Sequence, residues 1–318
     1  MQQASLGKGL PIVIMGDGFI DTDIADGTYD TVMDKTLENL FTEEPLKSLR
    51  DYFNVYAITA VSKNNNFGSG FETAFSCELE GGNSTGISGN DEAVMEYVES
   101  IEGVDLEEAL AVVILNSSAY AGTTYFGYSD GSKAVEFAIA YCPVIDNLES
   151  ESFRQVLVHE AVGHGFTKLE DEYSYEENGS IPASEIKSVK ELQVLGWALN
   201  VDFTTDENEV LWSDFLKDSR YTSEGIGIYE GACTYISGAY RPTYESMMNS
   251  NINGFNAPSR KAMYDMVMKR ATEQEPTYED FVTFDLPIQA QNRYTTRTAS
   301  AMKKPLPRPH FVNKELGN

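Results

Sequence analysis

Two of the three histidines in this 318-residue chain lie five positions apart, in the segment H-E-A-V-G-H-G that begins at His159. The third, His310, lies near the C-terminus. Imidazole is a common zinc ligand in proteins, and a glutamate directly after the first histidine, here Glu160, can serve as general base toward a metal-activated water. If the segment is a metal site, the chain must fold so that both imidazoles reach one ion.

The spacing of the pair does not fit a regular α-helix. Zinc peptidases commonly carry H-E-x-x-H, in which the histidines are four positions and about 40° apart around the helix axis. His159 and His164 are five positions apart, which corresponds to about 140° on an α-helix. Either a π-bulge with i→i+5 hydrogen bonds or a helix that ends near Gly163 brings the rings together. We favour the bulge; Gly163 and Gly165 facilitate both distortions.

Carboxylates that follow the second histidine can complete a metal site. Two histidines and one carboxylate form a standard catalytic zinc set, and Glu170, Asp171 and Glu172 come shortly after the pair. Since no further histidine lies in the interior of the sequence, we expect one of these acids to be the third ligand. The residues alone leave a second interpretation, in which the histidines have no metal and the acids form a solvated face.

The order of predicted elements indicates an α/β sheet domain in roughly the first half of the chain. Apolar and β-branched runs predict strands at 10–15, 53–61, 109–115 and 135–141, and helical spacing predicts helices at 29–41 and 91–101. A capping box at Ser152-x-x-Gln155 predicts the start of the helix that carries His159. The Gly- and Asn-rich segment 64–90 predicts a surface loop. In the less regular second half, helices are expected at 184–195 and 259–271.

Composition argues against several classes of function. With 23 Lys and Arg against 50 Asp and Glu, the net charge of −27 disfavours binding to nucleic acid or anionic lipid. The longest apolar run, Ala109–Leu115, is far shorter than the ~18 residues that span a membrane. Three cysteines without C-x-x-C argue against a zinc cluster or a disulfide framework. We expect buried thiols, with a single Cys77–Cys142 bridge as the alternative. The sequence before the first strand has no secretion signal, so such a signal has been removed or was never present. The first strand begins close to residue 1, which is compatible with a truncated start.

An acidic cluster near the N-terminus has two interpretations. The pattern D-x-D-x-x-D-G at 21–27 resembles a calcium loop, but its third acid is one position late and no glutamate completes the loop. We favour an acidic cluster at the start of a helix, where the helix dipole stabilises carboxylates.

Several long segments of the chain are similar to the IgA-specific metalloendopeptidase family of zinc peptidases, which has members in gut bacteria. The resemblance covers almost the full chain, and its most specific part is H-E-A-V-G-H-G-F-x-K-L-x-D-E-Y at 159–173. The other similar segments lie at 12–19, 40–64, 228–242, 245–249 and 255–264. Some members of the family share the i, i+5 histidine spacing, so the resemblance implies an intact site.

The resemblance implies a role for each matched residue of the long motif. His159 and His164 correspond to the zinc-binding histidines, and Glu160 corresponds to the general base. Asp171 matches the third ligand, and we prefer it to Glu170, whose position in the family is often filled by a small residue.

Two further roles follow from the same resemblance. Glu172 is a candidate to orient a histidine N–H from outside the ligand set. Peptidases of this kind place a methionine beneath the metal in a tight turn, and Ser246-Met247-Met248-Asn249 looks like that turn, with Met248 as the better candidate.

The resulting prediction is an α/β, metzincin-like zinc peptidase with a mixed twisted sheet and an active-site helix. One catalytic unit is expected, with an N-terminal α/β subdomain at 1–165, a less regular C-terminal subdomain at 166–275 and an irregular tail at 276–318. We expect a zinc-dependent endopeptidase of protein or peptide substrates, which pair with a free edge of strand 135–141. The resemblance implies a secreted or cell-envelope protein.

Two other functions remain open at the level of sequence. One is a catalytically silent domain that binds protein or glycan on the same fold, and the other is a zinc hydrolase of a non-peptide amide. The intact Glu160 disfavours the silent domain. The residues do not indicate substrate specificity or oligomeric state.

Overall fold

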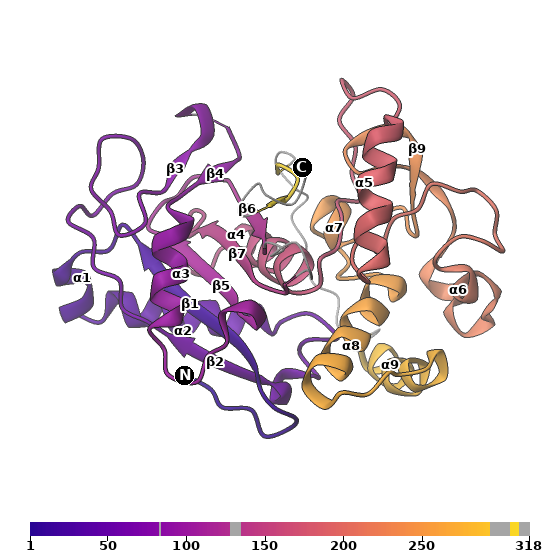
Figure 1. Ribbon diagram of the computed structural model, residues 1–318, viewed down its shortest axis with the longest axis horizontal. Coiled ribbons are helices and arrows are strands. Elements are labelled where there is room, and N and C mark those ends of the chain that lie inside the picture. The colour runs from indigo at the N-terminus through magenta and orange to yellow at the C-terminus, as the bar shows by residue number, and fades with distance from the viewer. Residues whose placement is uncertain (83, 128–134, 293–305, 312–318) are drawn as a thin grey trace. The chain divides into compact units, whose positions relative to one another are not determined.

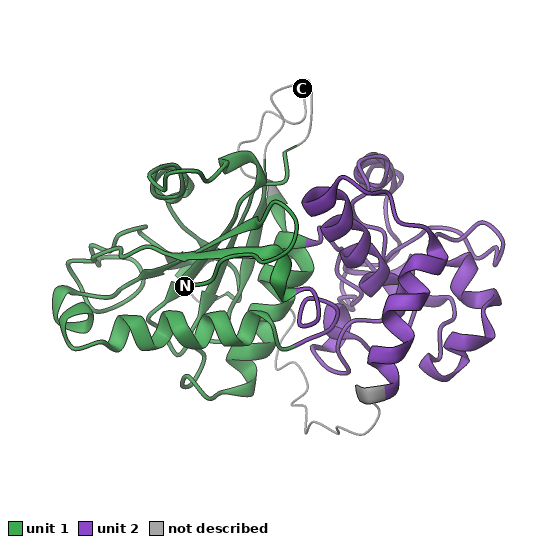
Figure 2. Ribbon diagram, turned by 90° about the horizontal axis from the view of Figure 1, so that it is seen from below, with its two compact units in different colours: residues 1–42, 50–166, 303–318 green, residues 43–49, 167–302 purple. Residues whose placement is uncertain are grey.

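The computed structural model describes residues 1–82, 84–127, 135–292 and 306–311 (Figure 1). Contacts divide the chain into two compact units, which Figure 2 colours separately. Unit 1 comprises residues 1–42, 50–166 and 303–318, and unit 2 comprises residues 43–49 and 167–302.

Unit 1 is built on a six-stranded sheet of mixed direction with the order β10-β6-β7-β5-β1-β2. Its strands are β1 (Leu10–Asp17), β2 (Phe53–Ala57), β5 (Leu110–Leu115), β6 (Thr123–Phe126), β7 (Ala138–Pro143) and β10 (His310–Phe311). β2, β1, β5 and β7 are parallel, and β6 is antiparallel to β7. Every residue of β1, β5 and β7 is buried, which explains why these strands are continuous apolar runs in the sequence.

Helices lie on both faces of this sheet (Figure 1). The helical elements of unit 1 are α1 (Asp21–Ala25), α2 (Thr28–Leu40), η1 (Arg50–Tyr52), η2 (Glu80–Gly82), α3 (Asp91–Glu99), η3 (Leu106–Glu108), α4 (Glu151–Leu157) and η4 (Val158–Phe166). Val94 and Val98 of α3 pack with Val13, Val113 and Ile139 on one face of the sheet. α2, α4 and η4 contact the strands as well. The predicted helices at 29–41 and 91–101 are confirmed to within two residues at each end.

The segment 64–90 is largely irregular, as expected, apart from η2 and a short hairpin of β3 (Glu78–Leu79) and β4 (Ile87–Ser88). Asp21 and Asp23 of the acidic cluster lie in the first turn of α1, and Asp26 is its C-cap. Asp23 Oδ2 accepts a hydrogen bond from the Ile20 backbone N–H at 2.9 Å. This confirms the expectation of acids at a helix start.

The described part of unit 2 contains helices, a β-hairpin and apolar clusters that include Val201 and Phe281. Its elements are α5 (Ala183–Val194), α6 (Ser213–Lys217), η5 (Ser219–Glu224), β8 (Tyr229–Ala232), β9 (Tyr235–Arg241), α7 (Met247–Ser250), α8 (Ala257–Thr272) and α9 (Tyr278–Asn292). The helices predicted at 184–195 and 259–271 are α5 and α8. The expectation of an irregular tail over 276–318 is wrong for α9, whose Phe281 is buried against Phe215 and Tyr221.

The strand expected at 135–141 does not have a free edge. It forms β7, displaced by about three residues, and it pairs with β5 on one side and β6 on the other. β6 was not predicted from the sequence; its outer edge pairs with β10 through Tyr125 and Phe126. An extended peptide therefore cannot add to β7, and the expectation of substrate pairing there is wrong.

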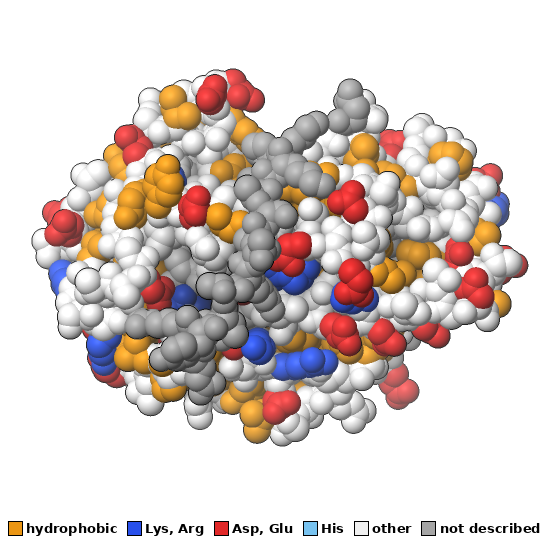
Figure 3. Space-filling model, turned by 180° about the vertical axis from the view of Figure 1, so that it is seen from behind, with side chains coloured by type: hydrophobic (Ala, Val, Ile, Leu, Met, Phe, Trp, Pro, Cys, Tyr) orange, Lys and Arg blue, Asp and Glu red, His pale blue; other side chains and the backbone are white. Residues whose placement is uncertain are grey.

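The acidic surface and the buried cysteines are those expected from the composition. Asp and Glu side chains occur across the whole face drawn in Figure 3, with fewer Lys and Arg among them. Cys77, Cys142 and Cys233 are all buried thiols, as predicted. Among the described residues, no helix is both long and apolar enough to cross a membrane.

Candidate metal centre

The helix that carries the first histidine begins at Glu151. Its N-cap is Ser150, whose hydroxyl accepts a hydrogen bond from the Phe153 backbone N–H at 3.4 Å. The capping box predicted at Ser152 is therefore wrong by two positions, and Ser152 is a buried residue within α4. Capping by a side-chain oxygen satisfies one of the backbone donors that every helix start leaves unpaired.

After Leu157 the helix continues as a π-helix, η4, over nine buried residues. Because i→i+5 hydrogen bonds lengthen each turn by one residue, side chains five positions apart lie one above the other. The prediction of π-type bonding between the two histidines is confirmed, although the distortion extends well beyond a single turn. Gly165 permits this packing, since a Cβ there would lie 2.7 Å from Leu110 Cδ1 and 3.2 Å from the Glu160 carbonyl oxygen.

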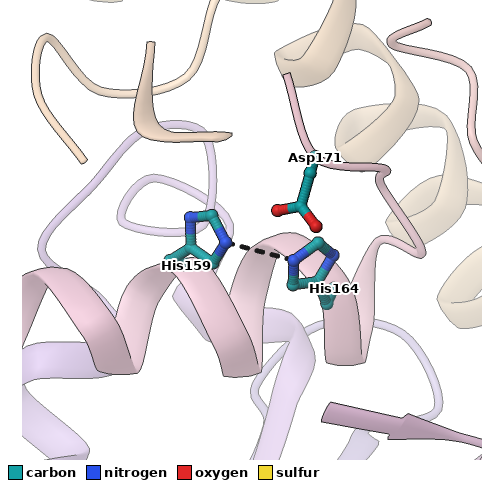
Figure 4. A group of neighbouring side chains, drawn as sticks. All are labelled: His159, His164 and Asp171. Carbon is teal, nitrogen blue, oxygen red and sulfur yellow. Dashed lines mark hydrogen bonds between the residues drawn. The ribbon is translucent and has the colours of Figure 1, made fainter. Parts of the chain in front are cut away.

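The π-helix brings the two imidazoles together. The Nε2 atoms of His159 and His164 are 3.1 Å apart, and the ring planes are inclined by 80°. Asp171, a few residues beyond the helix, points its carboxylate toward both rings (Figure 4). One ligand atom from each of the three residues lies within 4.8 Å of the others, and all three side chains are fully buried.

This geometry fits a zinc ion. Two nitrogens bound at ~2.0–2.1 Å in a tetrahedral site lie about 3.3 Å apart, close to the separation of the two Nε2 atoms. Two neutral imidazoles and one carboxylate also match the donor set of catalytic zinc, which keeps its fourth position for water or substrate. The three residues would hold such an ion through one ligand atom each.

Glu160 lies on the same helix, fully buried. The Thr124 hydroxyl of β6 is 2.7 Å from Glu160 Oε2 and 2.9 Å from the Glu160 carbonyl oxygen. Gly122, just before β6, leaves room for the same side chain, since a Cβ there would lie 2.9 Å from Glu160 Cγ. Neither Thr124 nor Gly122 was predicted from the sequence, because neither belongs to a motif.

The three acids after the histidines have different environments. Of the three, only Asp171 belongs to the cluster with the histidines. Glu170 is held through its backbone, since its N–H donates to Asn200 Oδ1 at 2.9 Å and its carbonyl oxygen accepts from Asn200 Nδ2 at 2.8 Å. The three candidates for the third ligand are thus distinguished by structure, which favours Asp171.

Glu172 does not have the expected role of orienting a histidine. Its buried carboxylate accepts hydrogen bonds from Asn200, Ser246 and Asn256. Burial raises the pKa of Glu172, although these three donors act in the opposite direction.

Met248 is fully buried in α7, the short helix of the segment that was expected to form a methionine turn. Its backbone carbonyl oxygen accepts a hydrogen bond from the Glu172 N–H at 2.8 Å. The segment thus contacts the chain directly after Asp171. A position of Met248 beneath a metal stays a prediction.

A mostly parallel α/β sheet, with a buried His–His–Asp cluster beside a glutamate, is a fitting scaffold for a metal-dependent peptidase. The family model described as IgA Peptidase M64 matches residues 2–222, more than half of the chain, and the chain belongs to this family. It is therefore a peptidase, which acts on protein or peptide substrates. The match includes the motif at 159–173 and ends before the similar segments at 228–264. A search of curated proteins gives no match.

Proposed function

We propose that the protein is a zinc-dependent endopeptidase of metzincin-like architecture, in which His159, His164 and Asp171 hold the metal. The observation that carries the proposal is the convergence of one ligand atom from each of these residues within 4.8 Å, with both histidines on a helix distorted in the way that their spacing requires. When bound at such a site, zinc polarises the scissile carbonyl and brings the pKa of a water to about 7.

In this proposal the protein's own residues transfer the protons. Glu160 removes a proton from the attacking water and returns it to the nitrogen of the leaving amine. A positioned general base of this kind contributes ~10²–10⁴-fold in rate. The Thr124 hydroxyl holds Glu160 Oε2 in place, so that the carboxylate keeps one orientation through both transfers.

The substrate would bind as an extended peptide along the outer edge of β6, the strand that carries Thr124, in place of β10. The net charge of −27 favours neutral or basic peptides over acidic ones, an effect that salt reduces. The family resemblance alone supports a secreted or cell-envelope location.

A paired measurement tests the proposal: zinc content, and cleavage of a broad peptide library by the wild type and by Glu160→Gln. We expect one zinc per chain in both proteins and cleavage by the wild type alone. Zinc without cleavage in the wild type would instead support a silent binding domain or a hydrolase of a non-peptide amide. Absence of zinc would contradict every metal-dependent function.

A further inference from the structure

The carboxylate of Glu172 joins three segments of unit 2 that are distant in sequence. Ser246 Oγ donates to Oε2 at 2.6 Å, Asn200 Nδ2 donates to Oε1 at 3.0 Å, and Asn256 Nδ2 lies 3.0 Å from both oxygens. Glu172 is fully buried. A buried charge is costly unless several hydrogen bonds replace its hydration, and here all three of these donors are neutral.

The three donors are themselves held in place. Asn256 is the N-cap of α8, and its Oδ1 accepts from the Ser259 backbone N–H at 3.1 Å. Asn200 also bonds both backbone groups of Glu170, as described above. Ser246 directly precedes α7. The Glu172 carboxylate therefore has a prepared site, and its position is determined by the ends of two helices and one loop.

From Asp171 to Tyr173, successive backbone groups form hydrogen bonds in alternating directions, as in an extended chain. The carbonyl oxygens of Asp171 and Tyr173 accept from the N–H groups of Cys233 and Thr234 at 2.8 and 3.0 Å. Between them, the Glu172 N–H points the other way and donates to Met248. In an extended chain successive side chains point to opposite sides, so a fixed Glu172 side chain directs Asp171 to the other side. Figure 4 shows that the Asp171 carboxylate points toward the two histidines.

We propose that Glu172 is a positioning residue for the metal site: by binding Asn200, Ser246 and Asn256, its carboxylate sets the direction of the Asp171 side chain before any ion is bound. This inference rests on the proposed function, in which Asp171 is the third ligand. Glu172 itself contacts neither metal nor substrate. Through Asp171, Glu172 affects the affinity of the site for the metal and the arrangement of the three ligands.

The test compares Glu172→Gln with Asp285→Asn. Glutamine keeps the shape of the side chain but presents its NH2 group to a site made of donors. Asp285 is also a buried carboxylate of unit 2; it pairs with Arg260 through two contacts of 2.8 Å on α8 and α9. Asp285→Asn is thus a matched control that lowers stability without altering the segment around Asp171.

Three properties of each variant are measured: the midpoint of urea unfolding without metal, the Kd for zinc, and the visible absorption spectrum of the cobalt(II)-substituted protein. For Glu172→Gln we expect zinc to bind ~10–100-fold more weakly, with altered cobalt bands, because groups that orient ligands have effects of this size. For Asp285→Asn we expect a lower unfolding midpoint with the wild-type Kd and spectrum.

Ser246→Ala provides a milder version of the same test, should Glu172→Gln fail to fold. It removes one donor and should weaken zinc binding in the same direction, by a smaller factor. Wild-type zinc affinity and cobalt bands in a folded Glu172→Gln protein, or in Ser246→Ala, would overturn this inference and leave the proposed function intact. A wild type that binds no zinc would overturn both.

Discussion

The hydroxyl of Thr124 lies 2.7 Å from Oε2 of Glu160, so a short strand of the sheet holds the glutamate of the histidine motif. The contact connects β6 with η4, and both residues are buried. The Thr124 hydroxyl gives the Glu160 carboxylate a fixed partner on the sheet. A catalytic group must be held in position in this way to transfer protons efficiently.

Replacing Thr124 by valine should lower kcat by about tenfold, because a small displacement of a catalytic group has effects of up to ~10²-fold. Zinc affinity should stay at the wild-type value. Thr124→Ser, which keeps the hydroxyl, is the matched control and should retain most of the activity. Steady-state cleavage of one fluorogenic peptide measures all three proteins; equal kcat values for valine and serine would contradict the role of the hydroxyl.

Gly122→Ala should displace Glu160 by crowding. The new Cβ would lie 2.7 Å from Val156 Cγ1 and 2.9 Å from Glu160 Cγ, closer than real Cβ contacts. We expect a reduced kcat and a loss of ~1–3 kcal/mol of unfolding free energy from overpacking. Gly179→Ala, where a Cβ would meet nothing within 4 Å, is the control. Full activity in Gly122→Ala would show that the glutamate has room to move.

Asp171→Asn should weaken zinc binding by more than the ~10–100-fold typical of residues that only orient ligands. Glu170→Gln changes the neighbouring buried acid, which the structure places outside the cluster, and should leave the Kd for zinc nearly unchanged. Competition with a zinc chelator of known affinity measures both. A larger loss of zinc affinity in Glu170→Gln than in Asp171→Asn would instead identify Glu170 as the third ligand.

The histidine spacing alone predicted a departure from α geometry at the site, because two rings five positions apart cannot meet on a regular helix. It left two geometries open, a π-bulge or a helix end near Gly163, and the structure has the favoured π-type helix. The central strands were also predictable, since strands buried on both faces are continuous apolar runs. β6 was not, because T-T-Y-F is too short to show a period. The partners of Glu172 could not be predicted either: Asn200, Ser246 and Asn256 are common polar residues that only the tertiary fold brings together.

Removing residues 303–318 should expose the outer edge of β6. In the structure β10 pairs with Tyr125 and Phe126, the His310 ring lies 5.5 Å from the Tyr125 ring, and Leu306 is fully buried. If an extended substrate binds along β6, the segment competes with it, and the truncated chain should have a lower KM for long peptides at similar kcat. His310→Ala should shift KM in the same direction by less. An unchanged KM in the truncated protein would mean that substrate does not use this edge.

The most direct test of a metal site at His159, His164 and Asp171 is an anomalous difference map, recorded at the zinc absorption edge from crystals of the purified protein. We predict one strong peak, ~2.0–2.1 Å from the Nε2 atoms of both histidines and ~2.0–2.2 Å from an oxygen of Asp171. A map without a peak between the two rings, from protein grown and purified with zinc present, would contradict the account.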